Sequence, residues 1–421
     1  MNILIKNITA ILKDGARYKT QTCDIYIMDN IIAGINRVPS GFFTERVING
    51  KGKLIAPGFV NAHTHAYMSV FRNSADDLAF DDWLFNHILP REDNLTGKDA
   101  YWGTLLSIIE MIKTGTTSFL DMHLFPHFVA KAVRDSGMRA VLSRAVVSND
   151  PSDPNGERRL KEHMSDMQEF ANIDTIGFMF SPHAPYSCDL KCIERCVELA
   201  NEYDTGIQIH LSEGKNEVEG IRKQYNCTPV ELMEKVGLLS NRLVAAHCVQ
   251  LTNHDIELLK KYEVNVATNP ISNLKLANGI APVPHMLRAG INVCLGTDSD
   301  ASNNNQNMVN EINFLTLIHK GFNKDPRLVS AHEGFKIATE NGAKALGINA
   351  GVIEEGRLAD LAIYNIDVPW FYPRADFVSA FAYSATGMEC ETLIVNGKIL
   401  MEAGELTTID EKKVYAEVSQ K

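Results

Sequence analysis

The residues with the clearest chemical potential are two histidines at the end of an apolar stretch. Residues 54–66 read LIAPGFVNAHTHA, so His63 and His65 follow a run with the composition of a buried strand. Alternate side chains of a strand share a face, and we expect both imidazoles on one side of the strand end. Together they can bind one metal ion, with metal–nitrogen bonds of about 2.0–2.1 Å. Two ordinary histidines are the alternative, and the motif alone does not decide.

Three further apolar stretches end in residues of the same chemical type. GIQIHLSE contains His210 and then Glu213, LVAAHCV contains His247, and NVCLGTDS contains Asp298. Each residue alone is typical of a buried polar group without catalytic function. Four strands that finish in such residues predict one shared site, provided that the strands end on the same side of a sheet.

This residue set predicts a catalytic metal site. Three neutral imidazoles and one carboxylate would hold one divalent ion and leave a position for water, as catalytic sites do: His63, His65, His210 and Asp298. The ion lowers the pKa of that water to about 7. Zinc is the expected ion, and iron or manganese are alternatives that these ligands do not exclude.

Three of the residues are expected to move protons or stabilise charge. Asp298 can take the proton of the water, and His247 can hydrogen-bond the resulting hydroxide. Glu213 lies an odd number of residues beyond His210 and would face away on a continuing strand. We therefore expect it just past the strand end, turned back by the loop, where it can pass a proton to the leaving side of a substrate. The alternative is a solvated loop acid.

The elements that must position these residues alternate between short apolar strands and amphipathic helical stretches. Eight such strands, from GFVNAHTH to NVCLGTDS, predict a (β/α)8 TIM-type barrel, which belongs to the α/β class. Active sites of this architecture lie at the carboxyl ends of the strands. The histidines, Glu213 and Asp298 all stand at those ends, so the barrel predicts that they converge.

The two ends of the chain have a different character. Residues 1–53, and the later ADLAIYNID and ETLIVNGKIL, alternate apolar and polar residues, and turn signals such as Asn396-Gly397 lie among them. They predict a small β-sandwich domain assembled from both chain ends. We place this domain at residues 1–55 and 350–421, and the catalytic barrel at residues 56–349.

Composition limits the classes of partner. The chain has 421 residues and a formal net charge of -11, which disfavours nucleic acid and anionic membranes. It has no uncharged apolar run near the about 18 residues of a membrane span, and its start does not resemble a signal peptide. Eight scattered cysteines without Cys-x-x-Cys fit a reducing cytoplasm. Cys188, Cys192 and Cys196 favour a packed helix face over a thiolate metal site. A homo-oligomer is compatible with the sequence.

The chain resembles the amidohydrolase superfamily and, within it, the 5-methylthioadenosine/S-adenosylhomocysteine deaminases. The resemblance covers nearly the whole chain, in PGFVNAHTHAYMSVFRNSADDL, DDWLFNHILPRED, IEMIKTGTTSFLDMH, SPHAPYS, IHLSE, AAHCVQL, NPISNLKLANGIAPV, LGTDSDASNNN and IEEGRLADLAIYN. HLSE and GTDSDASNNN are fairly specific to deaminases of amino-heterocycles.

The resemblance implies a substrate and a reaction. Hydroxide would attack carbon 6 of an adenine nucleoside, Glu213 would protonate the ring nitrogen, and ammonia would leave through a tetrahedral intermediate. The expected substrates are 5-methylthioadenosine, S-adenosylhomocysteine and adenosine. The alternative is deamination or dechlorination of guanine, cytosine, a pterin or an s-triazine. A non-catalytic barrel is disfavoured because every expected ligand is present.

The resemblance also implies which residues line the substrate pocket: Trp83, Glu92, Arg144, Arg159 and His183. The residue matching Glu92 bonds the ribose hydroxyls in relatives, and those matching Arg144 and Arg159 meet the carboxylate of S-adenosylhomocysteine. Without the family, Trp83 reads as helix packing, Arg144 as a strand-end residue and Arg159 as a solvated helix residue. Arg158 adjoins Arg159 and competes for its role.

Two comparisons with the family sharpen these expectations. Two-metal relatives carry a modified lysine at the end of the fourth strand, where this chain has SPHAP with His183, so we expect one metal per chain. The chain also departs from common family patterns. Ser299-Asp300 stands where Gly-Ala usually follows the metal aspartate, and Thr268 stands where many relatives have histidine. Both departures bear on the substrate and leave the reaction class unchanged.

Overall fold

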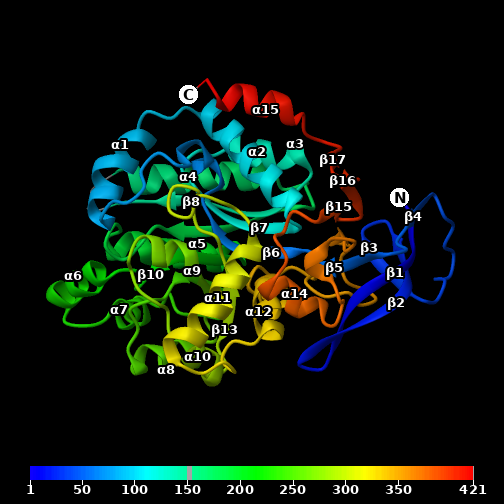
Figure 1. Ribbon diagram of the computed structural model, residues 1–421. Coiled ribbons are helices and arrows are strands. Elements are labelled where there is room, and N and C mark those ends of the chain that lie inside the picture. Colours follow the sequence, from blue (N-terminus) through cyan, green and yellow to red (C-terminus); the bar gives the residue numbers. More distant parts are fainter. Residues whose placement is uncertain (149–153, 421) are drawn as a thin grey trace.

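The computed structural model describes residues 1–148 and 154–420 and contains two sheets (Figure 1). The larger unit is an eight-stranded parallel sheet with its strands in chain order: β6 (Phe59–Thr64), β7 (Thr116–His123), β8 (Arg139–Val146), β9 (Ile176–Pro182), β10 (Gly206–Leu211), β11 (Leu243–His247), β12 (Asn265–Thr268) and β13 (Asn292–Leu295). A parallel bridge between Thr64 and Asp298 joins the first strand to the chain beyond the last. The expected (β/α)8 barrel is confirmed.

The barrel strands are apolar because helices cover them outside and side chains fill the interior. Every residue of β6, β7, β8, β10, β11 and β12 is buried, as expected for parallel strands covered on both faces. Inside, Val60, Leu120 and Val244 belong to one apolar cluster with Ala343 and Leu346. That cluster joins the strands to α13 (Glu340–Ala345), so the interior is a packed core.

The helices that follow the strands are amphipathic, and several begin at capping boxes. Thr96 with Asp99, Thr252 with Asp255, and Ser330 with Glu333 each exchange hydrogen bonds at a helix start. The helices of this layer are α2 (Gly97–Lys113), α3 (Phe128–Ser136), α4 (Pro154–Glu169), α5 (Leu190–Glu202), α6 (Lys215–Tyr225), α7 (Pro229–Lys235), α8 (Asn253–Lys261), α9 (Pro270–Lys275), α10 (Val283–Ala289), α11 (Met308–Asn323) and α12 (Ala331–Ala338).

Between β6 and α2 the chain makes a long excursion. It forms η1 (Ala66–Phe71), η2 (Asp82–Ile88) and the short α1 (Leu89–Glu92). This segment follows His63 and His65 directly and carries the predicted pocket residues Trp83 and Glu92, so it is part of the substrate end of the barrel.

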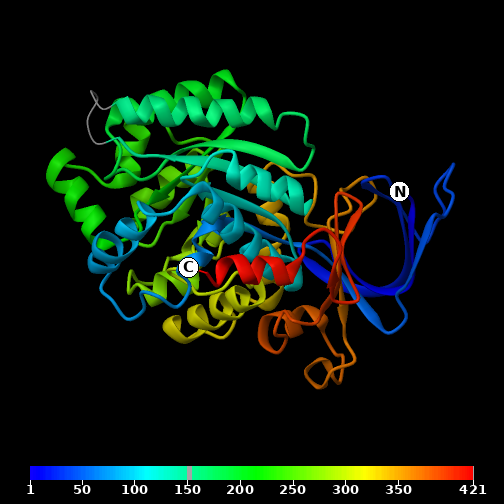
Figure 2. The ribbon, with the colours of Figure 1, turned by 90° about the horizontal axis from the view of Figure 1, so that it is seen from above.

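The smaller unit is a nine-stranded mixed sheet built from both ends of the chain. Figure 2 shows the N-terminal and C-terminal strands side by side on one flank of the barrel. Its strands are β1 (Ile3–Asp14), β2 (Arg17–Met28), β3 (Ile31–Ile35), β4 (Arg46–Asn49), β5 (Lys53–Pro57), β14 (Leu361–Asn365), β15 (Cys390–Val395), β16 (Lys398–Glu402) and β17 (Glu405–Leu406). Antiparallel pairing of β5 with β14 joins the two chain ends.

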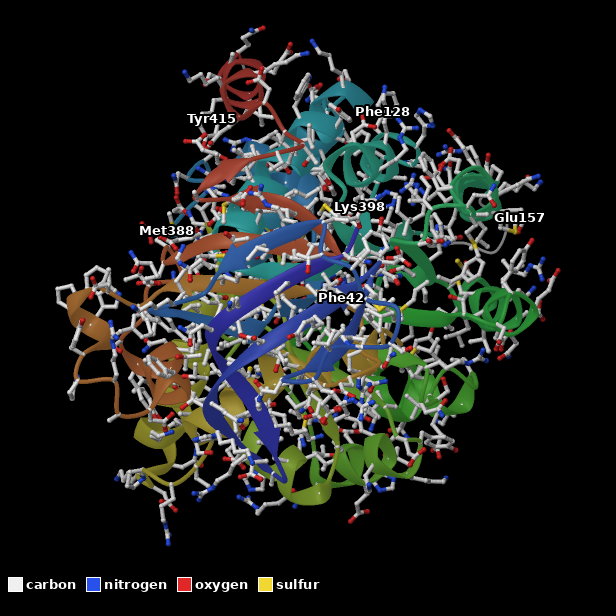
Figure 3. All side chains as sticks on the ribbon, turned by 90° about the vertical axis from the view of Figure 1, so that its right-hand side faces the viewer. Phe42, Phe128, Glu157, Met388, Lys398 and Tyr415 are labelled. Atoms are coloured by element: carbon white, nitrogen blue, oxygen red, sulfur yellow. The ribbon has the colours of Figure 1, made fainter. Side chains whose placement is uncertain are left out.

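The mixed sheet has its own core, rich in isoleucine. Ile3, Ile25, Ile55 and Ile394 are fully buried in one aliphatic cluster. Figure 3 looks onto this flank, where Phe42 follows the first strands of the sheet and Lys398 begins β16. β-branched side chains on alternating positions are the composition that such a sheet favours.

The C-terminal part also contacts the barrel. After η3 (Pro369–Phe371), α14 (Phe377–Tyr383) packs on α11 and α12, and α15 (Glu411–Val418) packs on α2. The domain limits at residues 55/56 and 349/350 therefore stay a prediction. All eight cysteines are buried free thiols. Within residues 1–148 and 154–420, no helix has the length and apolar character needed to cross a membrane.

Candidate active site

The structure brings the metal-type residues of the strand ends together. His63 lies in β6 and His65 directly follows it, His210 lies in β10, His247 ends β11, and Asp298 follows β13. Oδ1 of Asp298 lies 3.7 Å from Nε2 of His63 and 3.4 Å from Nε2 of His65. Nε2 of His65 lies 3.2 Å from Nε2 of His210. The ends of four strands thus contribute to one cluster.

Two overlapping groups in this cluster have the spacing for one ion. Their potential ligand atoms lie within 4.8 Å of one another: His63, His65 and Asp298 in one group, and His63, His210 and His247 in the other. His63 is common to both groups. Each of the four predicted ligands belongs to at least one of these two groups, and His247 is a fifth candidate.

Hydrogen bonds around the cluster fix which imidazole nitrogen is free. Nδ1 of His65 donates to the carbonyl oxygen of Met122 at 2.8 Å, and Nδ1 of His210 donates to that of His183 at 2.8 Å. Nδ1 of His63 faces Oε1 of Gln208 at 3.2 Å. Each ring therefore keeps its proton on Nδ1 and presents a lone pair at Nε2, the arrangement that supports a metal-binding histidine.

These lone pairs fit a cation. The Nε2 atoms of His65 and His210 face each other without a proton to share, and Nε2 of the fully buried His63 has no hydrogen-bond partner within the described residues. Burial and then the nearby His65 lower the pKa of His63 to about 3, and burial likewise lowers the pKa of His65 and His210. An unpaired buried acceptor is costly, and a divalent ion between these atoms would satisfy all three.

The carboxylate of Asp298 is held toward the histidines. Its Oδ2 accepts hydrogen bonds from Ser272 at 2.6 Å and Ser302 at 2.9 Å, which leaves Oδ1 facing the imidazoles. Its backbone has a φ of 61°. Gly296, two residues earlier, lies so close to β6 that an added Cβ would come 2.7 Å from the carbonyl oxygen of His63. Burial raises the pKa of Asp298, but the surrounding imidazoles outweigh it and lower the pKa to about 2.

Glu213 lies where its spacing predicts, past the end of β10 and turned back toward the cluster. Ser212 makes the turn with a left-handed φ of 50°. Oε2 of Glu213 lies 3.8 Å from Nε2 of His247, and its Oε1 accepts a hydrogen bond from Asn278 at 3.0 Å. Burial raises the pKa of Glu213, which suits a carboxyl group that carries and returns a proton. Glu213 is 6 % exposed, so it is not a solvated loop acid.

His247 is positioned as the partner of Glu213. Its Nδ1 donates to Oδ1 of Asn273 at 2.9 Å, and its backbone φ is 72°. Burial alone would lower the pKa of His247, but the charges of Glu213 and Asp298 outweigh burial and raise it. His247 is therefore the imidazole of the cluster that most readily holds a second proton.

Two predicted pocket residues, Glu92 and Arg144, belong to one buried polar group around Tyr67. The Tyr67 hydroxyl donates to Oε1 of Glu92. Burial raises the pKa of Glu92 to about 7, while the hydrogen bond from Tyr67 and the charge of Arg144 oppose the rise. Arg144 lies in β8 and pairs with Glu162 at 3.3 Å. Sequence reasoning missed Tyr67, although its place two residues after His65 was a usable signal.

Arg159 and His183 lie next to this group, on the side of the fourth strand. Nη1 of Arg159 donates to the carbonyl oxygen of Val147 at 2.7 Å. Burial lowers the pKa of Arg144 and of His183, and the charge of Arg159 adds to both effects. The side chain of the neighbouring Arg158 is 55 % exposed, so Arg159 is the one that faces inward. The ring of His183 is tilted by 55° against that of His210, with centroids 4.7 Å apart.

Trp83 packs against one wall of a cavity that reaches Glu213. The cavity has a volume of about 450 Å³ and is lined by Phe80, Tyr186, Glu213, Glu217 and Asn278 among others. Trp83 is buried on η2 and packs against Phe80, with ring centroids 6.0 Å apart. It is thus connected to the cavity wall through Phe80, whereas among the described residues it makes no hydrogen bond or ring contact with the histidines.

Asp300, which departs from the common family pattern, is buried in a network of hydrogen bonds. Asp300 is fully buried, and its Oδ2 accepts hydrogen bonds from Arg72 at 2.9 Å and from Ser107 at 3.2 Å. Arg72 also pairs with Glu110 of α2. The unusual carboxylate therefore ties the loop that carries Asp298 to the segment that follows His65. Thr268, the other departure, ends β12 and is buried.

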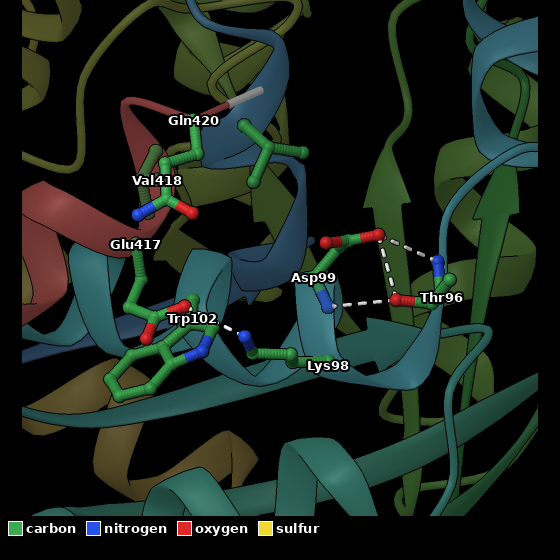
Figure 4. A pocket seen from close by; sticks show the side chains of 8 residues that line it. Thr96, Lys98, Asp99, Trp102, Glu417, Val418 and Gln420 are labelled. Atoms are coloured by element: carbon green, nitrogen blue, oxygen red, sulfur yellow. Dashed lines mark hydrogen bonds and ion pairs between the residues drawn. The ribbon is translucent and has the colours of Figure 1, made fainter.

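A second and smaller cavity lies away from this chemistry. It has a volume of about 160 Å³ and separates the start of α2 from the C-terminal helix α15 (Figure 4). Lys98 pairs with Glu417 across it at 2.9 Å, and Trp102 forms one wall. None of the metal-type residues of the strand ends lines it.

Comparisons with known proteins identify the family of the chain. The profile of the Amidohydrolase family matches residues 54–400. The chain is 44% identical over 429 residues to a "5-methylthioadenosine/S-adenosylhomocysteine deaminase" of Thermoanaerobacter pseudethanolicus, covering 100% of this chain and 98% of that protein. It is 42% identical to a "5'-deoxyadenosine deaminase" of Methanocaldococcus jannaschii, covering 99% and 98%. The crystal structure of an adenosine deaminase from Xanthomonas campestris with bound zinc has a TM-score of 0.94 at 28% identity, covering 99% and 97%.

Proposed function

This chain belongs to the amidohydrolase family, and from that premise we propose that it is a metal-dependent hydrolytic deaminase of adenine nucleosides. Its substrates are 5-methylthioadenosine, S-adenosylhomocysteine and adenosine, and its products are the inosine analogue and ammonia. The observation that carries the proposal is the buried carboxyl group of Glu213 beside a cluster of metal-type side chains. The similarity to curated nucleoside deaminases over the full chain supports the substrate class.

We assign the metal to His63, His65, His210 and Asp298. Their free Nε2 atoms and the Oδ1 atom converge, and their other polar atoms are engaged by carbonyl, amide or hydroxyl groups. Zinc is the proposed ion, one per chain, in line with the zinc bound to the similar adenosine deaminase. When bound, a divalent ion supplies Lewis-acid chemistry that lowers the pKa of a water to about 7.

Glu213 and Asp298 transfer the protons, and His247 stabilises charge. The oxygen of water bonds to carbon 6 of the purine as one of its protons passes to Asp298, and Glu213 gives a proton to the adjacent ring nitrogen. The amino group then takes the proton from Asp298 and leaves as ammonia as its bond to carbon 6 breaks, and Glu213 regains a proton from the hydroxyl group on carbon 6. Asp298 is positioned to take a proton from the water. His247, whose pKa the surrounding carboxylates raise, can donate a hydrogen bond to the oxygen as charge develops on it.

The remaining predicted residues shape the substrate pocket. We assign Glu92 to the ribose hydroxyls, and Arg144 with Arg159 to the carboxylate of S-adenosylhomocysteine. Arg144 and Arg159 are close enough that each charge disfavours the other, and a substrate carboxylate between them would relieve that repulsion. Trp83 and His183 are assigned to the pocket wall.

A substrate panel tests the proposal. Ammonia release from 5-methylthioadenosine, S-adenosylhomocysteine, adenosine, guanine and cytosine should give the highest kcat/KM with an adenine nucleoside. Glu213→Gln should keep its metal and lose about 10²- to 10⁴-fold in kcat. A preference for guanine or cytosine would refute the substrate class, and near-wild-type turnover by Glu213→Gln would remove Glu213 from the mechanism.

A further inference from the structure

The carboxyl group of Glu213 is fixed by side chains from other loops, and we propose that Asn278 is a positioning residue for proton transfer by Glu213. In this role the Asn278 amide holds one carboxyl oxygen, so that the other oxygen carries the proton. The inference rests on one part of the proposed function, namely that Glu213 transfers a proton during the reaction.

The turn before Glu213 is held from two sides. The carbonyl oxygen of Ser212 accepts hydrogen bonds from the backbone N–H groups of Val249 at 3.0 Å and Gln250 at 2.8 Å, both in the loop after β11. The N–H groups of Ser212 and Glu213 donate to the two oxygens of Glu217, each at 2.8 Å. The backbone N–H and carbonyl groups of Ser212, which has a left-handed φ, are therefore both hydrogen-bonded, and so is the N–H group of Glu213.

The side chain of Glu213 is held by a third loop. Nδ2 of Asn278 donates to Oε1 of Glu213 at 3.0 Å, and Asn278 is 9 % exposed. Nε2 of Gln250 donates to the carbonyl oxygen of Asn278 at 2.6 Å, which anchors the residue in turn. Loops that follow β10, β11 and α9 are thus joined in a closed ring of hydrogen bonds around Glu213.

This ring distinguishes the two oxygens of Glu213. Oε1 is occupied by the amide of Asn278, while Oε2 faces the cluster, 3.8 Å from Nε2 of His247. A carboxyl group free to rotate would present either oxygen and lose the alignment that proton transfer needs. The amide also stabilises the carboxylate left when the proton has moved, because hydrogen bonds to the charged form favour that form.

Asn278 also lines the 450 Å³ cavity, so direct contact with substrate is the competing explanation. The two roles differ kinetically. A group that binds substrate in both the ground and transition states changes KM, whereas a group that acts through Glu213 changes kcat.

The test uses the full-length, metal-loaded protein. Asn278→Asp keeps the size of the side chain but removes the N–H donor and places a second carboxylate beside Glu213. Asn278→Ala removes the donor without adding charge. Both variants should keep the metal and lose about 10- to 100-fold in kcat, with KM changed less than about threefold. Asn313→Asp is the matched control, because Asn313 donates to the carbonyl oxygen of Ala382 at 2.8 Å, far from the site.

A double-mutant cycle identifies the path of the effect. In a Glu213→Gln background, Asn278→Ala should lower kcat little further, because the effects of two residues that act as a unit are not additive. An equal loss in both backgrounds, a loss that falls on KM, or near-wild-type kcat for Asn278→Asp would overturn the proposal. The kcat and KM ratios are measured with the amino-heterocycle that the wild type deaminates fastest. They therefore test the role of Asn278 whether or not adenine nucleosides are the substrates.

A measurement without turnover completes the test. The infrared carboxyl band of Glu213, identified by its loss in Glu213→Gln, should shift in Asn278→Ala because one oxygen loses its donor. An unshifted band would show that the amide does not engage Glu213 and would overturn the positioning role even if the kinetic loss were present.

Discussion

The two sheets of this protein each enclose a buried core but place different residues in it. The core of the mixed sheet is aliphatic, with Ile3, Ile25 and Ile55 fully buried. The barrel strands end in buried histidines and carboxyl groups, and His63 and His247 are no more than 1 % exposed. One region is organised around apolar packing and the other around ionisable groups.

The difference shows where stability and chemistry reside. Burying an aliphatic side chain stabilises a fold by about 1.5–3 kcal/mol. Burying a polar atom without a partner costs about 1–3 kcal/mol, and Nε2 of His63, which has no hydrogen-bond partner among the described residues, is the atom that we assign to the metal. Backbone conformations of the site also depart from the common regions, at Ser212, His247 and Asp298. The barrel therefore carries a destabilised site that the surrounding packed strands must support.

The largest expected effect is the loss of the metal from the barrel site. His63→Ala should abolish metal binding and turnover, because His63 belongs to both groups of potential ligands. The measurement is the metal content of purified protein by elemental analysis, together with a circular dichroism spectrum that stays unchanged. His319→Ala, which alters another buried histidine on α11, is the control and should keep the metal. Near-stoichiometric metal in His63→Ala would remove it from the ligand set.

The next largest effect is a loss of stability in the core of the mixed sheet. Ile25→Ala should lower the free energy of unfolding by about 2–5 kcal/mol, because it opens a cavity in the isoleucine core. Turnover per folded molecule should stay at the wild-type value. Urea unfolding and kcat measured on the same preparation test both statements. Val47→Ala on β4, where the side chain is 54% exposed, should change stability little. A loss of kcat in folded Ile25→Ala would mean that the mixed sheet tunes the site.

The smallest effect distinguishes two substrates that bind at the same site. Arg144→Met should impair S-adenosylhomocysteine by about 10- to 150-fold in kcat/KM and spare adenosine, because a charge-assisted hydrogen bond is worth about 1.5–3 kcal/mol. Glu92→Ala should impair both substrates alike, since both carry the ribose. Arg158→Met, an exposed neighbour of Arg159, serves as the control. Equal losses by Arg144→Met on both substrates would make Arg144 structural.

Much of the fold was predictable because its signals are local. Each barrel strand is a short apolar run, and each alternates with an amphipathic helix, so the barrel followed from the periodicity around residues such as Val60 and Val244. The polar residues that end the strands were visible for the same reason. Once the barrel was inferred, the common end of its strands brought His63, His210 and Asp298 into one hypothesis. Their roles as ligands stay a prediction.

The tertiary structure alone decided how those residues are held. Asn278 reaches Glu213 across 65 residues of sequence, and Arg72 reaches Asp300 across 228. Neither pair has a periodicity or spacing that a sequence reveals, because the contact depends on where two loops come together. The same holds for Glu217, whose carboxylate accepts two buried backbone hydrogen bonds from the turn before and at Glu213. Sequence determined which side chains stand at the strand ends, and packing between distant loops decided where each of their polar atoms points.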